Sequence, residues 1–248
     1  MKALSFSLSA LATLALGAAP ALAADPPAVP KLEFVRVPGG CFQMGSDAGE
    51  KHERPVHKAC VGDFELGKYE VTQGQWKAVM GTNPAYHASC GDDCPVEMVS
   101  WNDAQEFITA LNSRKIGVIR LPTEAEWEYA CRDGGKDQVY AGKGDASSLD
   151  RLAWFKARDI KITHPVGRKE PNALGLYDMS GNVWEWVQDT FASPYRTSAC
   201  CAVAPSTAAK TTCAAPFAIA MMRRVRIGAL DCGWCAKSPS PESSNRGR

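Results

Sequence analysis

The sequence has little net charge and few histidines. Its 28 Lys and Arg residues nearly balance its 27 Asp and Glu residues, which gives a formal net charge of +1 over 248 residues. Binding to nucleic acid or to a charged membrane surface needs a basic patch, so this balance argues against both partners. The four histidines are not spaced with carboxylates as in iron or zinc sites. No Gly-x-Ser-x-Gly motif marks a nucleophilic serine.

Long apolar runs are absent except at the N-terminus. Residues 3–16 are apolar after a single lysine, and small residues follow at 21–24. This order is typical of a secretory signal peptide over residues 1–24. The run is shorter than the ~20 residues of a spanning helix, which argues against a membrane anchor. We therefore expect a periplasmic or secreted protein without a membrane span, with a proline-rich leader at residues 25–33.

Cysteine is abundant, with ten residues. In an exported chain this number predicts disulfides. Cys41 follows one predicted strand and Cys60 lies in the next, which predicts a bridge between neighbouring strands. Cys90 and Cys94 enclose a turn-forming Gly-Asp-Asp, which predicts a local bridge. Cys131 ends a predicted helix and is expected to be buried and unpaired.

A metal site is the alternative interpretation of the Cys90 and Cys94 pair. Asp92 lies between the two cysteines and His87 is near in sequence. Hard carboxylates and soft thiolates rarely share a metal ion, and no second thiol pair is nearby. The disulfide is therefore the favoured interpretation.

Capping signals and apolar spacing place several elements. Two capping boxes, at Thr72 and Thr123, each start a helix that carries a tryptophan. A third helix begins near Asn102, because apolar residues recur three or four apart after it. Trp76, Trp101 and Trp127 are then expected in the core. Strands are predicted at 34–37, 41–44 and 64–71, and the polar stretch 133–163 is predicted to be a loop.

The segment 175–189 concentrates more chemistry than any other part of the chain. It reads GLYDMSGNVWEWVQD, with two tryptophans, two glycines and three carboxylates. The glycines allow close approach of backbone, and the tryptophans supply apolar bulk. Asp178, Asn182, Glu185 and Asp189 supply hard oxygen ligands or buried hydrogen bonds. The composition indicates a structured site within a core.

Six motifs together resemble the formylglycine-generating enzyme family, also called sulfatase-modifying factor domains. Besides 175–189 they are VPGGCFQMGS at 37–46, GKYEVT at 67–72, PVEMVSW at 95–101, RLPTEAEWEYA at 120–130 and HPVG at 164–167. They occur in the family's order. The resemblance implies one compact α+β domain, C-type-lectin-like and largely irregular, over residues 34–196.

The resemblance also implies a structural calcium site. Relatives with catalytic activity bind Ca²⁺ through a side chain, two backbone carbonyls and a glutamate, which fall here on Asp178, Gly181, Val183 and Glu185. Calcium takes six to eight oxygen ligands, so added water would complete the site. The alternative is that Asp178 and Glu185 hydrogen-bond buried amides and arginine. The family's other calcium site is expected to be lost, because Gly167 stands where the family has a carboxylate.

The tail at 197–248 does not resemble the family as it is written. It is rich in Ala, Cys, Arg and Ser without a usable period, so it is expected to pack poorly. Reading the gene one frame off from near Arg196 allows residues 197–207 to decode to QRVLRGGSFN, and residues 227–232 to WGFRL. Both are family signatures in the expected order. The sequence therefore predicts a frameshift in this region.

The cysteine pair that catalytic relatives use to bind Cu(I) is missing in either frame. In the restored frame its second position overlaps Ala215 and Pro216 and encodes Ser, Pro, Thr or Ala, never Cys. This argues against copper. The Cys232-Gly-Trp-Cys235 motif resembles a thioredoxin-type redox motif, but no helix start follows it to lower a thiol pKa.

Three functions are compatible with these observations. The favoured one is a non-catalytic binding or scaffold module with a protein or glycan partner in the cell envelope. The alternative is a formylglycine-generating oxidase that converts a sulfatase cysteine to formylglycine. A different enzyme activity on the same scaffold is the third.

Overall fold

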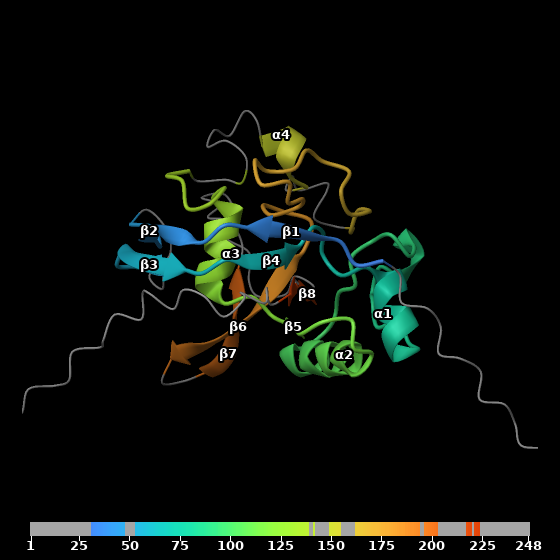
Figure 1. Cartoon of the computed structure of the whole chain (residues 1–248). Helices are drawn as coiled ribbons and strands as arrows, with labels where there is room; N and C mark the ends of the chain where they lie inside the picture. The colour runs from blue at the N-terminus through green and yellow to red at the C-terminus, as the bar shows by residue number, and fades with distance from the viewer. Residues whose placement is uncertain are drawn as a thin grey trace, which may run out of the picture.

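Short strands and helices joined by long irregular connections make up the structure (Figure 1). The computed structural model describes residues 31–47, 53–138, 141, 149–154, 162–193, 196–202, 217–219 and 221–223. The expected signal peptide, most of the leader and the Cys232–Cys235 motif lie outside these ranges. The described elements form the mixed α+β architecture that the sequence predicts.

The central sheet has four strands in the order β1-β4-β9-β5. They are β1 (Phe34–Val37), β4 (Phe64–Gly67), β9 (Met222–Arg223) and β5 (Ile119–Arg120). Neighbouring strands are antiparallel. The predicted strand 64–71 ends early at Gly67, because the chain leaves the sheet after the Gly67 amide donates to the carbonyl of Met221.

A separate hairpin pairs β2 (Gly40–Met44) with β3 (His57–Val61). Strand alternation sends Phe42 inward, where its ring meets Tyr129 edge-on with centroids 5.4 Å apart. In Figure 1 the hairpin lies beside α3 (Glu124–Cys131), at the opposite end of the view from α1. Cys41 and Cys60 are on the outer, exposed face.

The three predicted helices are confirmed. They are α1 (Gln73–Met80), α2 (Trp101–Ser113) and α3, and each begins with a reciprocal capping box. At Thr72, for example, the hydroxyl accepts from the Gln75 amide at 3.2 Å and Gln75 Oε1 accepts from the Thr72 amide at 3.0 Å. No helix within the described ranges is long and apolar enough to cross a membrane.

The described residues also contain two shorter helical segments. They are the 3-10 turn η2 (Ala88–Cys90) and α4 (Leu149–Leu152). The latter interrupts the stretch 133–163 that was expected to be loop. Leu149 and Leu152 are both buried, and this apolar pair explains why the turn forms there.

Buried side chains gather in two clusters. One packs α3 against the central sheet and the β2–β3 hairpin. The other fills the space among α1, α2 and β5, where Trp76 stacks on Phe107 with ring centroids 5.0 Å apart. Trp76 and Trp127 are buried and Trp101 is partly buried, as the sequence predicts.

Three segments of the tail pair with strands of the domain through their backbone, while the expectation that the tail's side chains pack poorly stays a prediction. β7 (Arg196–Ala202) and β8 (Phe217–Ile219) pair with opposite edges of β6 (Trp184–Ser193). β9 fills the gap between β4 and β5, and the adjacent Met221 is buried. Strand pairing uses backbone groups, so open edges can be filled without the side-chain alternation on which the expectation rested.

Candidate functional site

Three buried carboxylates gather where the segment 175–189 meets the irregular connection between β4 and α1. Glu70, Asp178 and Glu185 are 2%, 4% and 5% exposed. Asp178 and Asn182 both have left-handed backbone, with φ of 58° and 63°, so this segment is tightly turned before β6 begins. The carboxylates are near enough for their charges to repel one another. We call these three residues the acidic cluster.

Asn182 connects the acidic cluster to the backbone of His164. Its amide nitrogen donates to Glu70 Oε2 at 2.7 Å and to the carbonyl of His164 at 3.1 Å. Its oxygen accepts from the His164 amide at 3.0 Å. The Val183 amide also donates to Glu70, at 3.4 Å. Glu70 is therefore a member of the site, although the sequence analysis gave it no role beyond its place in the GKYEVT motif at 67–72.

Asp178 is only half satisfied. Its Oδ2 accepts from the Gly167 amide at 2.8 Å, whereas its buried Oδ1 has no hydrogen-bond partner. A Cβ at Gly167 would lie 2.5 Å from the Tyr69 ring, so a side chain at this position would collide with Tyr69 unless that ring moved. A buried carboxylate oxygen without a partner is costly unless water, a proton or a cation meets it.

Glu185 accepts a hydrogen bond from the indole Nε1 of Trp127. Gly181, which separates it from Asp178, must be glycine, because a Cβ there would lie 2.6 Å from the Trp154 carbonyl. The partners of Asp178 and Glu185 are thus a backbone amide and an indole. These hydrogen bonds resemble those of the predicted alternative for Asp178, whereas Glu185 pairs with Trp127 and with no arginine among the described residues; the choice between this alternative and calcium stays open.

Burial sets the charge state of the acidic cluster. Desolvation raises the pKa of Asp178 to about 6, against the lowering effects of the Gly167 amide and of Lys169. Desolvation also raises the pKa of Glu185 to about 7, with repulsion from Asp178 adding to it. The pKa of Glu70 is raised well above its ordinary value by burial and by both neighbours. The site therefore holds protons, or another cation, near neutral pH.

The four predicted calcium ligands offer two carboxylates and two backbone carbonyls. Asp178 and Glu185 are hard oxygen donors, and the unpartnered Oδ1 of Asp178 fits a role as ligand. Among the described residues, no three His, Cys, Asp or Glu side chains are arranged around one metal position. A calcium ion here would therefore rely on Asp178, Glu185 and the carbonyls of Gly181 and Val183, with water.

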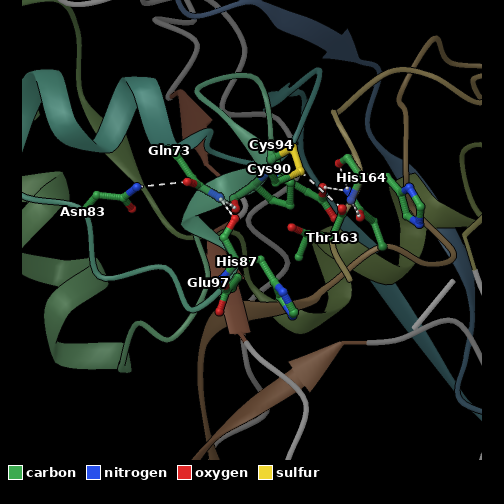
Figure 2. The surroundings of a disulfide bond; sticks show 11 residues. Gln73, Asn83, His87, Cys90, Cys94, Glu97, Thr163 and His164 are labelled. Carbon is green, nitrogen blue, oxygen red and sulfur yellow. Dashed lines mark hydrogen bonds between the residues drawn. A yellow bond between two sulfur atoms is a disulfide. The ribbon is translucent and has the colours of Figure 1, made fainter. Parts of the chain in front are cut away.

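Both predicted disulfides are confirmed. Cys41 pairs with Cys60 at a Cα separation of 4.0 Å, and Cys90 pairs with Cys94 at 5.9 Å. Cys131 is a buried free thiol, as predicted. The metal alternative for Cys90 and Cys94 is excluded because their sulfurs are bonded to each other (Figure 2).

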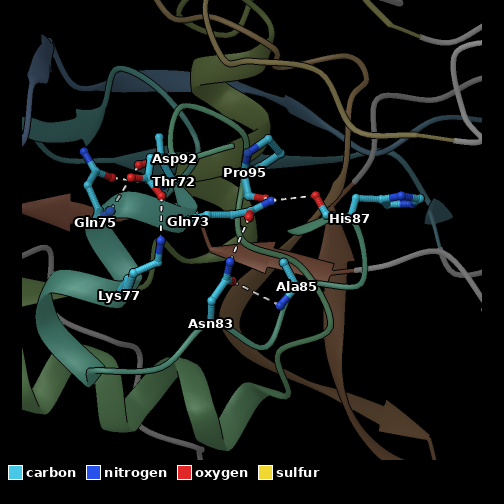
Figure 3. A network of polar contacts seen from close by, with 9 residues as sticks. All are labelled: Thr72, Gln73, Gln75, Lys77, Asn83, Ala85, His87, Asp92 and Pro95. Atoms are coloured by element: carbon cyan, nitrogen blue, oxygen red, sulfur yellow. Dashed lines mark hydrogen bonds and ion pairs between the residues drawn. The ribbon is translucent and has the colours of Figure 1, made fainter. Parts of the chain in front are cut away.

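A buried polar network behind the second disulfide was missed by the sequence reasoning. Gln73 is fully buried and donates to the carbonyls of His87 and Pro95, while Asn83 donates to it at 2.9 Å (Figure 3). Glu97 is also fully buried and accepts from the His87 amide at 2.6 Å. No local signal distinguishes Gln73 from an ordinary first-turn glutamine, so only the structure reveals this network.

The fold and the Trp-flanked acidic cluster define an irregular α+β domain of the sulfatase-modifying type. Residues 20–226 match the family described as the sulfatase-modifying factor enzyme 1-like domain. The chain belongs to this family.

Individual relatives agree with this assignment. The chain is 32% identical over 212 residues to the chaperone protein LppX of Paenibacillus barcinonensis, covering 65% of this chain and 73% of that protein. It is 30% identical over 250 residues to the formylglycine-generating enzyme of Mycobacterium tuberculosis, covering 73% and 83%. Treponema denticola variable protein 1 shares the fold, with a TM-score of 0.65 at 22% identity over 78% of this chain and 95% of that chain.

Proposed function

We propose that this protein is an exported, non-catalytic member of its family that serves as a binding or scaffold module for a protein or glycan in the cell envelope. The observation that carries the proposal is the state of the five cysteines that precede residue 196. Four of them are consumed in two disulfides, and the fifth is buried. A formylglycine-generating site needs two thiolates to hold Cu(I).

Cys131 is unsuited to that chemistry. It is 3% exposed and donates to the carbonyl of Met179 at 3.3 Å. Burial, with repulsion from Glu185 and Glu128, raises its pKa to about 12, so the thiol stays protonated at physiological pH. A protonated, inaccessible thiol neither binds copper well nor meets a peptide substrate.

The relatives support both the proposal and its alternative. The Paenibacillus relative carries the name of a chaperone, which is a binding function. The Mycobacterium relative is a formylglycine-generating enzyme, so the alternative for this chain is the same oxidation of a sulfatase cysteine. We favour the first, because the second requires a thiol pair that neither reading frame supplies.

We also propose calcium as a structural component of the module, held by Asp178, Glu185 and the carbonyls of Gly181 and Val183. Its chemistry would be the neutralisation of buried negative charge, with no part in a reaction. The unpartnered Asp178 Oδ1 and the raised carboxylate pKa values support this proposal.

A frameshift near Arg196 remains part of the proposal. The pairing of β7, β8 and β9 with the domain is compatible with it, because backbone pairing does not identify the reading frame. Resequencing the codons for residues 195–199 tests it directly. An uninterrupted, confirmed frame through these codons would rule the frameshift out.

The activity test uses a peptide containing Cys-x-Pro-x-Arg, incubated with the protein, Cu(I) and O₂. Mass spectrometry then reports whether the cysteine becomes an aldehyde. The Mycobacterium relative is the positive control under identical conditions. We expect no aldehyde with this protein, and multiple-turnover aldehyde formation would establish the alternative function.

A further inference from the structure

The Cys41–Cys60 disulfide lies on the outer face of the β2–β3 hairpin. The two residues are direct partners in the antiparallel register, and both are exposed. From this placement we infer that the bridge is an exchangeable redox site, which reacts with a dithiol protein of the thioredoxin type. The inference is independent of the proposed binding function.

Exposure makes the sulfurs accessible to an attacking thiolate. Exchange requires the nucleophile to reach one sulfur in line with the bond, which an outward-facing cross-strand bridge permits. Lys58 lies two residues before Cys60 and therefore on the same face of the hairpin. Its positive charge attracts the incoming thiolate and stabilises the thiolate that leaves.

The hairpin does not depend on this bridge for its position. Its inner side is held by α3, where Phe42 packs on Tyr129. Arg132 donates to the carbonyls of Gln43 at 3.1 Å and Gly45 at 2.9 Å, and the Gly45 amide donates to Glu128 at 2.9 Å. Reduction of the bridge therefore produces two thiols on a hairpin that stays folded, so the same two cysteines can be oxidised to a disulfide again.

The Cys90–Cys94 disulfide provides a contrast within the same chain. Cys94 is fully buried, and Cys90 Sγ lies 3.2 Å from the carbonyl oxygen of Thr163 (Figure 2). The backbone at this disulfide also provides a hydrogen-bond acceptor for the first turn of α1, because the Gln73 amide donates to the Cys94 carbonyl at 2.8 Å. Cys90 is only partly buried, but the burial of Cys94 leaves this bridge less accessible to a partner protein than the Cys41–Cys60 bridge, whose two cysteines are both exposed.

Thiol–disulfide exchange with the partner takes two steps. A thiolate of the partner attacks one sulfur of the Cys41–Cys60 bond, forming a mixed disulfide and releasing the other cysteine as a thiolate. The partner's second thiol then attacks the mixed disulfide and closes the partner's own disulfide. Two electrons pass from the partner to the bridge, and both cysteines of the hairpin take up protons to end as thiols.

The test is reduction of the folded, oxidised full chain by thioredoxin kept reduced in excess. Samples are quenched with acid, alkylated and mapped by peptide mass spectrometry. Cys41 and Cys60 should be labelled at least about tenfold faster than Cys90 and Cys94, as accessibility controls exchange. Near- and far-ultraviolet circular dichroism should stay unchanged meanwhile. Repeating the experiment with the five cysteines after residue 199 changed to serine removes exchange within the chain.

Charge-removing variants provide the matched control. Lys58→Gln should slow labelling of Cys41 and Cys60 by about two- to threefold at low ionic strength, and added salt should reduce the difference. Lys77 is an exposed lysine that pairs with Asp92 beside the other disulfide. Lys77→Gln should leave the labelling rate of Cys41 and Cys60 unchanged. The inference is overturned if Cys41–Cys60 resists reduction as long as Cys90–Cys94 does, or if its reduction coincides with loss of the folded signal.

Discussion

Raising the pH of the calcium-free protein should destabilise it through the acidic cluster. Folding raises the pKa of Asp178 from 3.8 to about 6 and that of Glu185 from 4.5 to about 7. Between pH 5 and 7 the unfolded chain has already lost protons that the folded chain keeps, so stability falls as pH rises. At 1.36 kcal/mol per pH unit, the loss from pH 5 to 8 is about 1 kcal/mol for Asp178 and about 3 kcal/mol for Glu185.

Urea denaturation at pH 5 and pH 8 in the presence of chelator measures this loss. Because the two carboxylates interact, the combined fall should be about 3 to 4 kcal/mol. The Asp178→Asn Glu185→Gln double variant keeps the shape of both side chains and one acceptor oxygen in each, but cannot ionise. It should lose the fall that Asp178 and Glu185 cause and keep only the pH dependence that the raised pKa of Glu70 adds. A wild-type stability that rises from pH 5 to 8, or a double variant with the same pH profile, would refute this reasoning.

Two further predictions concern the same region. Calcium at pH 8 should raise the melting temperature in a concentration-dependent way, because calcium at one hundred times its dissociation constant adds about 2.7 kcal/mol to the free energy of unfolding. No shift at millimolar calcium, or the same shift in an Asp178→Ala Glu185→Ala variant, would contradict calcium binding. Gly167→Ala should destabilise by about 1 to 3 kcal/mol more than Gly175→Ala, as measured by urea denaturation. Both glycines have left-handed φ, of 69° and 88°, but only at Gly167 would a Cβ meet the Tyr69 ring; equal losses would contradict the crowding seen there.

The sequence predicted the features that depend on near neighbours. The capping boxes at Thr72 and Thr123 are local hydrogen-bond patterns, so three or four residues determine them. The Cys90–Cys94 bridge spans four residues, and the turn between them favours it.

Two features that depend on distant contacts were not predicted. Glu70 joins the acidic cluster through Asn182, which is 112 residues away in sequence. The pairing of β9 between β4 and β5 depends on open strand edges rather than on its own residue pattern. In both cases the decisive partner lies far along the chain, where residue spacing carries no information.

The central claim is that this member of the family does not make formylglycine. The most direct measurement compares the protein as written with a frame-restored version in the peptide aldehyde assay, with Cu(I) and O₂ supplied to both. The sequence analysis predicts that neither frame encodes the second cysteine of a copper pair, so the peptide cysteine should stay unmodified with both proteins. Aldehyde formation by either protein, at a rate that scales with its concentration, would contradict the claim.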